Sequence, residues 1–181
     1  MRALTRYSHQ LEKKPILTKC ITSFCTFGLG DLISQYLEKK NTDKPWEWVR
    51  FIRQASFGFV IAPYFHLNYC VISPRFFGGS SKGVLMSVIY DQTVSVCIFT
   101  SLFFTYLDTT SGKSLQQATD ELKVKMLPTL LANWKVWPFI MLINFTIIPI
   151  PFRVFYTNIC GMFWAAYLSY VQNVKAKKQM L

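Results

Sequence analysis

Two carboxylates lie inside stretches of the chain that are otherwise apolar. Asp31 lies in the stretch Thr18–Leu37, and Asp91 lies in the stretch Val84–Leu107. Each stretch has about 20 residues, the length that an α-helix needs to cross a bilayer. A carboxylate at mid-depth in hydrocarbon costs roughly 3 kcal/mol or more, so it normally turns inward and has a partner or a function. The sequence therefore predicts a membrane protein with a polar interior.

Further polar side chains accompany these two carboxylates. Asp31 and Gln35 are four residues apart and therefore share one face of a helix. A buried carboxylate needs a cation or several donors, and the sequence offers Arg50, Arg53 and Arg153 as cations. Two interpretations stand: an ion pair that fixes the register of two helices, or a group that sets solute selectivity. The polar candidates for the interior or for a pore are Asp31, Gln35, Arg53, His66, Asp91, Gln92 and Arg153.

Small or polar residues recur at every fourth position of the apolar stretches. In the first stretch they are Thr22, Thr26, Gly30 and Ser34, and in the third they are Gly83, Ser87, Asp91 and Ser95. Small residues four apart let helices approach closely in lipid, so tight helix packing is one interpretation. The other is that part of each stripe lines a polar conduit.

The apolar stretches predict an all-α integral membrane bundle of four spanning helices, forming a single membrane domain over residues 1–181. The predicted spans are Thr18–Leu37, Gln54–Ile72, Val84–Leu107 and Phe152–Val171.

Three further segments connect or interrupt these spans. The segment Ser73–Gly83 contains Pro74 and two adjacent glycines and is predicted to be a loop. The polar stretch Asp108–Lys125 is predicted to be a surface helix. Leu127–Ile148 is apolar but contains Lys135 and Pro138, which indicates a broken or re-entrant helix rather than a straight span.

The N-terminus is predicted to form a basic amphipathic helix. Leu4, Tyr7 and Leu11 recur at roughly helical spacing, and the basic residues clearly outnumber the one acid, Glu12. Such a segment resembles a mitochondrial targeting segment. An interfacial helix that precedes the first span is the alternative, and the two are compatible.

Charge and motif content indicate which partners and which kinds of site the chain can have. The formal net charge is +11, with basic residues scattered over several loops rather than along one face. This distribution favours the lipid bilayer, with anionic headgroups, over nucleic acid. The cysteines and two histidines show no metal-ligand spacing, and no nucleotide-binding or hydrolase motif occurs. We therefore expect no metal site, no cofactor and no enzymatic activity.

Motifs along nearly the whole chain resemble the Mpv17/PMP22 family of small peroxisomal and mitochondrial membrane proteins. The first-span motif is Gly30-Asp31 with Gln35, the second includes Pro63 and His66, and the third-span pair is Asp91-Gln92. The most specific set of motif residues is Asn133, Trp134, Trp137 and Pro138, followed by Asn144, Phe145, Pro149, Arg153, Trp164, Tyr167, Leu168 and Ser169. The chain departs from the family pattern at Ala62, Asn68, Cys97 and Met141.

The resemblance implies a four-span bundle in the mitochondrial inner membrane or, alternatively, in the peroxisomal membrane. It implies passage of small solutes in support of mitochondrial homeostasis, and packing roles for Gly30, Pro63, Asn133, Trp134, Trp137, Pro138, Asn144 and Trp164. The alternative function is a non-conducting accessory or structural subunit of a large inner-membrane complex, such as the respiratory chain or ATP synthase. A larger membrane complex or a homo-oligomer is the expected partner assembly.

Overall fold

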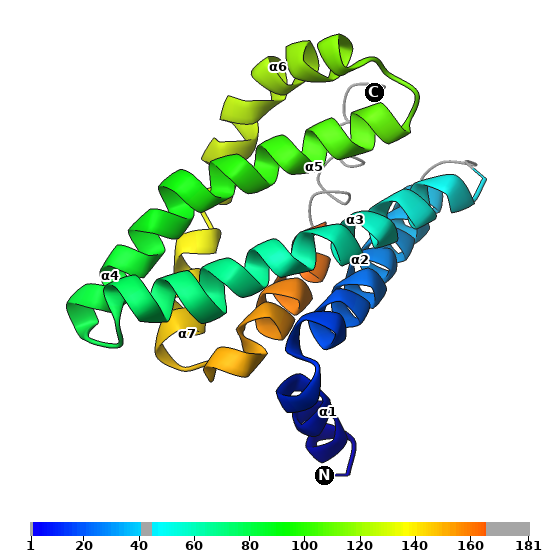
Figure 1. Cartoon of the computed structure of the whole chain (residues 1–181). Coiled ribbons are helices and arrows are strands. Elements are labelled where there is room, and N and C mark those ends of the chain that lie inside the picture. Colours follow the sequence, from blue (N-terminus) through cyan, green and yellow to red (C-terminus); the bar gives the residue numbers. More distant parts are fainter. Residues whose placement is uncertain (1, 41–44, 166–181) are drawn as a thin grey trace. The chain divides into compact units, whose positions relative to one another are not determined.

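The computed structural model describes residues 2–40 and 45–165, and in this part of the chain every regular element is a helix (Figure 1). The described residues form two compact units. One contains residues 2–40, 45–62 and 158–165, and the other contains residues 63–157. The expectation of a single membrane domain over residues 1–181 stays a prediction.

The first unit begins with α1 (Arg2–Lys13) and α2 (Pro15–Lys39), followed by the start of α3 (Trp48–His66). Lys14 separates the first two helices with a non-helical backbone (φ −140°, ψ 66°), and Pro15 takes the first position of α2. Proline suits that position because it needs no N–H partner there. The predicted amphipathic N-terminal helix is confirmed as α1.

The second unit begins at Pro63 within α3. This helix continues as the π-helix η1 (Leu67–Phe77). The unit then contains α4 (Ser81–Tyr90), the π-turn η2 (Asp91–Ser95), α5 (Val96–Thr110), α6 (Leu115–Asn133), α7 (Trp137–Thr146) and the 3₁₀ turn η3 (Ile150–Phe152). Residues 153–165 are helical again. The helices α5 and α6 pack side by side as a hairpin (Figure 1).

Three continuous helical segments are long and apolar enough to cross a membrane: Pro15–Lys39, Trp48–Phe77 and Ser81–Thr110. The pair α6 and α7 adds a fourth if its two helices, bent by 60°, count as one span. The all-α membrane fold and the broken helix near residues 127–148 are therefore confirmed. The predicted span Phe152–Val171 is helical over residues 153–165, and its last residues lie outside the described part of the chain.

The break between α6 and α7 follows from Pro138. Its ring has no N–H to bond the carbonyl four residues back, that of Trp134, and clashes with that carbonyl in a continuous helix. Val136 accordingly leaves the helical region (φ −125°), and a new helix starts at Trp137 with proline in its first turn.

The predicted loop Ser73–Gly83 is corrected by the structure. The helix runs through Pro74 to Phe77, and only residues Gly78–Ser80 lie outside a helix. Gly78 supplies a positive φ of 70°, and the Ser80 side chain accepts from the Gly83 N–H to cap α4. Proline is tolerated in a membrane helix when neighbouring groups satisfy the freed carbonyl, and the group that does so is described below.

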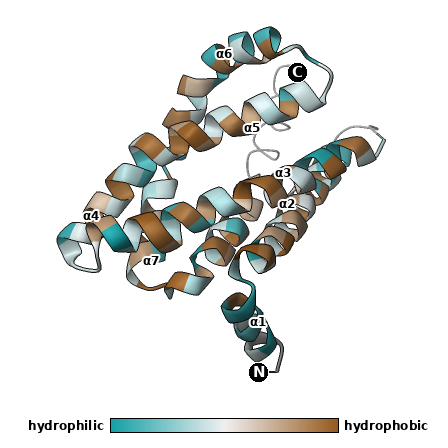
Figure 2. Cartoon of the chain, viewed as in Figure 1, coloured by the Kyte–Doolittle hydropathy of each residue, from teal (hydrophilic) through white to brown (hydrophobic). Residues whose placement is uncertain are grey.

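Large apolar side chains are exposed on the long helices, while small and polar ones are buried. Leu17, Ile21 and Leu85 are about half exposed, whereas Ser23 and Ser87 are buried. This is the reverse of the usual soluble pattern and is expected of helices that face lipid. Figure 2 shows hydrophobic residues recurring along α2 to α5, with hydrophilic residues concentrated in α1 and the first part of α6.

A close contact between α2 and α3 occurs at Gly58 of α3. A Cβ atom placed there would lie 2.5 Å from the Ser23 carbonyl oxygen of α2 and 2.8 Å from Cβ of Phe27. At Gly30, by contrast, a Cβ would lie 3.5 Å from Cα of Met162, an ordinary contact. The α2–α3 crossing therefore requires glycine at position 58, and Gly30 tolerates a methyl group.

We expect Gly58→Ala to destabilise the protein by roughly 1–3 kcal/mol, the usual cost of overpacking. Gly30→Ala is the matched control and should be neutral or slightly stabilising, because alanine is the better helix former. Thermal unfolding in detergent, followed by circular dichroism, measures both variants. Equal losses for the two variants would contradict this account of the crossing.

Candidate functional site

Asp31 lies in a buried network at the end of the first unit where α2 meets the start of α3. The carboxylate accepts from Arg50 Nε (2.8 Å) and from Gln35 Nε2 (2.7 Å), and the Asp31 side chain is 2% exposed. Arg50 also binds Glu38 through two bonds of 2.8 Å each. The cation that pairs with Asp31 is therefore Arg50, rather than the other candidates Arg53 and Arg153.

Gln35 extends this network to the backbone that precedes α3. Its amide nitrogen donates to the Glu47 carbonyl (3.1 Å), and its amide oxygen accepts from the Glu47 N–H (2.7 Å). Asp31, Gln35 and Arg50 thus fix the end of α2 against the start of α3. This geometry favours the structural interpretation of Asp31, the ion pair that sets helix register.

Asp91 and Gln92 lie in the second unit at the start of the π-turn η2, and both are buried. The Asp91 carboxylate accepts from Gln92 Nε2 (2.7 Å) and interacts with the buried Tyr69 side chain. The Gln92 carbonyl accepts from the indole N–H of Trp134 (2.8 Å). A π-turn interrupts the regular helical ladder and often occurs at functional sites; here an indole from the α6–α7 break binds at the turn.

Several buried polar atoms in the second unit have no hydrogen-bond partner among the described residues. Asn144 of α7 is fully buried, and neither its amide nitrogen nor its amide oxygen is paired. The same holds for Gln92 Oε1, Asn133 Oδ1 and Trp137 Nε1. Since α7 packs against α4 and η2, these atoms belong to the part of the unit that also holds Asp91.

The small residues that recur at every fourth position of the third span are buried, and some of them hydrogen-bond to neighbouring helices. Gly83, Ser87, Asp91 and Ser95 are all buried. Ser87 accepts from Ser73 of η1 (2.7 Å), and Ser95 binds the Tyr64 hydroxyl (3.0 Å). Most of this stripe therefore joins neighbouring helices, and Asp91 is its one charged member.

Arg153 explains how a helix continues through Pro74. In π-helical bonding the Tyr69 carbonyl would accept from the N–H of residue 74, which proline lacks. Arg153 Nη1 donates to that carbonyl instead (3.1 Å), while Nη2 and Nε donate to the carbonyls of Phe145 and Ile148 near the end of α7. The guanidinium also lies over the Phe145 ring, 5.3 Å from its centroid. One arginine thus satisfies carbonyls from two helices.

The remaining predicted residues have simpler positions. Arg53 and His66 are half-buried on α3, and Pro63 is exposed on the same helix. Gly30 contacts Met162 in the first unit, and Trp164 is half-buried there. The candidate residues thus divide between the units, with Asp31, Gln35 and Arg53 in one and His66, Asp91, Gln92 and Arg153 in the other.

The sequence did not predict a cluster of four charged residues at the α5–α6 turn, called here the Lys113 clamp: Asp108, Lys113, Glu121 and Lys125. Lys113 binds Asp108 (2.9 Å) and Glu121 (2.7 Å), and Lys125 binds the same two carboxylates. The hydrogen bonds that Lys113 donates to Glu121 and to Asp108 raise the pKa of this lysine. The spacing of Glu121 and Lys125, four apart on a helix, was the available signal.

Comparisons with known proteins find one family model and several relatives that are similar to this chain. The model of the Mpv17 / PMP22 family matches residues 108–169. "PXMP2/4 family protein 4" of Dictyostelium discoideum is 32% identical over 169 residues, covering 92% of this chain and 91% of its own. "Protein SYM1" of Gibberella zeae is 32% identical, covering 92% and 95%. "Peroxisomal membrane protein 2" of Bos taurus is 30% identical, covering 93% and 88%. No solved structure matches the chain.

Replacing Arg153 by methionine should destabilise the protein by roughly 1–2 kcal/mol, the upper range for polar contacts in membrane proteins. Pro74→Ala restores an N–H that can donate to the Tyr69 carbonyl. The double variant should therefore lose less stability than the sum of the two single variants, measured as a double-mutant cycle of thermal unfolding in detergent. Strict additivity would show that Arg153 and Pro74 are not coupled.

Removing the cation of the Asp31 network should destabilise the protein more than Arg153→Met does. Arg50→Met leaves a buried carboxylate without its cation, for which we expect a loss of roughly 3–5 kcal/mol. Adding Asp31→Asn removes that stranded charge and should recover part of the loss. The thermal unfolding midpoints of the single and double variants test whether Arg50 and Asp31 pair. A double variant no more stable than Arg50→Met would refute the pairing.

Proposed function

The chain belongs to the Mpv17/PMP22 family, and from this premise we propose that it is a channel-like protein that passes small solutes across the mitochondrial inner membrane and so supports mitochondrial homeostasis. It is a membrane protein of organelle membranes. The basic amphipathic helix α1 supports the mitochondrial placement, and the peroxisomal membrane is the alternative. The proposal includes no enzymatic activity and no cofactor.

The observation that carries the proposal is the set of buried polar atoms in the second unit that have no hydrogen-bond partner in the described part of the chain. Leaving one buried polar group unpaired costs about 1–3 kcal/mol, and Asn144 alone contributes two such atoms. Groups of this kind are normally satisfied by ordered water or by a ligand. A polar interior that binds water or a small solute is what a conduit requires.

Asp91 is the residue that we expect to set selectivity. Its partners, Gln92 and Tyr69, carry no positive charge, whereas Asp31 is paired with Arg50. Carboxylates lining a pore attract cations and exclude anions. An Asp91 carboxylate without a compensating cation would therefore favour cation passage, and the neutralised Asp31 would contribute less.

The partners follow from the same arrangement. Contact with the lipid bilayer follows from the membrane-spanning helices. We further propose contact with anionic lipids, supported by the net charge of +11, and assembly as a homo-oligomer or within a larger complex.

Reconstitution of the purified protein into planar bilayers tests the function. We expect conductance, and a reversal potential under a salt gradient that reports cation preference. Asp91→Asn should reduce that preference clearly, and Asp31→Asn should reduce it less. Asp120→Asn is the matched control, because Asp120 is exposed on α6 beside Lys123 (2.9 Å) and should have no effect.

A silent wild-type protein would overturn the proposal and favour the accessory-subunit function. In that case, deletion of the protein should destabilise a larger inner-membrane complex on native gels. Equal effects of Asp91→Asn and Asp120→Asn would show that surface charge, rather than the interior, sets the preference.

A further inference from the structure

The helices α1 and α2 enclose a groove that the proposed function does not use. Its volume is about 310 Å³, and it is lined by Tyr7, Gln10, Lys14, Leu17, Thr18, Ile21 and Thr22. All these residues belong to the first unit. From this groove we infer a binding site for one anionic phospholipid, with its phosphate at Lys14 and an acyl chain along Leu17 and Ile21. The inference stands whether or not the protein conducts.

The groove has rigid walls. Leu11 of α1 is buried, and the Tyr7 hydroxyl lies 3.2 Å from the Thr22 hydroxyl. The Thr18 hydroxyl donates to the carbonyls of Gln10 (3.1 Å) and Lys14 (2.8 Å), which ties the bend between the helices to the first turn of α2. The two helices are therefore fixed against each other on both sides of the bend.

The chemistry of the groove changes along α2. The segment that is long and apolar enough to cross a membrane starts at Pro15, so Lys14 would lie at the level of the headgroups when this helix crosses a bilayer. Leu17 and Ile21, four residues apart on one face of α2, lie one and two turns deeper and are 46% and 53% exposed. A phospholipid has the same order, with a phosphate above and hydrocarbon below.

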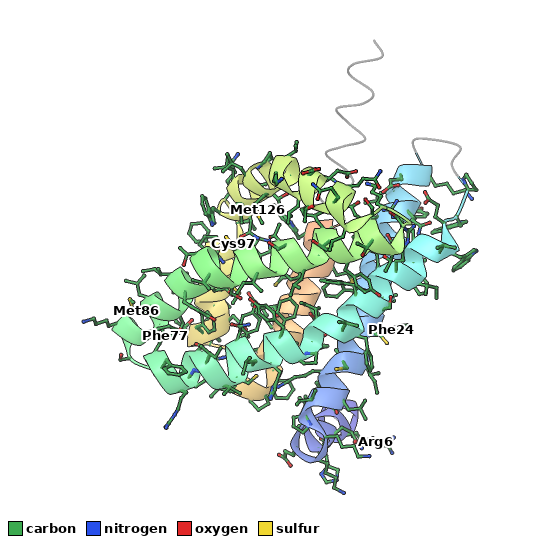
Figure 3. The ribbon with its side chains drawn as sticks, turned by 45° about the horizontal axis from the view of Figure 1, so that its top comes forward. Arg6, Phe24, Phe77, Met86, Cys97 and Met126 are labelled. Carbon is green, nitrogen blue, oxygen red and sulfur yellow. The ribbon has the colours of Figure 1, made fainter. Side chains whose placement is uncertain are left out.

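Charge complementarity selects an anionic lipid. Lys14 is exposed and forms no ion pair among the described residues, and the exposed Arg6 and Lys13 lie on the same short helix with one acid, Glu12. Figure 3 labels Arg6 on α1. Basic side chains near the membrane surface attract anionic headgroups, while the apolar wall excludes a free phosphate ion as the preferred occupant.

Native mass spectrometry of the full-length protein in detergent tests the site. The probes are dioleoyl phosphatidylglycerol, dioleoyl phosphatidylcholine with the same acyl chains, and inorganic phosphate. We expect the wild type to bind one phosphatidylglycerol more tightly than phosphatidylcholine. Lys14→Gln should weaken binding of the anionic lipid about fivefold, the effect of one basic residue near the membrane surface, and should remove most of the preference.

Three further variants test whether binding depends on this groove. Ile21→Trp fills the lower groove from an exposed position and should abolish binding of both lipids, and Leu17→Trp is the second filling variant if the first fails to fold. Lys82→Gln is the matched control, because Lys82 is an exposed lysine at the start of the span Ser81–Thr110, and it should bind as the wild type does. Equal weakening by Lys14→Gln and Lys82→Gln, unchanged binding in the filling variants, or displacement of the lipid by phosphate would overturn the site.

Discussion

Polar groups at membrane depth must find their hydrogen-bond partners inside the protein, because hydrocarbon offers none. This constraint explains why many small or polar side chains are buried on the long helices while many large apolar ones are exposed. It also explains the position of Arg153, whose guanidinium reaches carbonyls of η1 and of the end of α7. Without such a cation, a proline in the middle of a membrane helix would leave a carbonyl unpaired.

The two π-helical segments satisfy this constraint in different ways. In η1 the widened helix carries Pro74, and the carbonyl left by the missing N–H is bonded by Arg153. In η2 the Gln92 carbonyl accepts from Trp134. Both segments therefore depend on side chains far away in the sequence, from the α6–α7 break and from the last helix. Residues of the family motif that look scattered in sequence thus meet at the irregular turns of the second unit.

The sequence predicted the elements whose causes are local. Apolar length predicted the spans, and Pro138 predicted the break between α6 and α7. The ion pair of Asp31 was predicted as one of three choices of arginine. The loop predicted around Pro74 was wrong, because the carbonyl that the proline leaves without an N–H is bonded by Arg153, which lies 84 residues from Tyr69. The Lys113 clamp was missed for a similar reason, since two of its members lie across the turn between α5 and α6.

Asp31 and Asp91 show why residue type and depth alone do not assign a role. Both are buried aspartates in apolar helices, and both bind a glutamine amide at 2.7 Å. They differ in whether a cation lies within reach: Arg50 pairs with Asp31, while Asp91 has Gln92 and Tyr69. A paired carboxylate holds helices in register and presents little net charge to a solute. A carboxylate without a cation carries its charge only where water or a solute reaches it, and charge presented to a solute is the property on which ion selection depends.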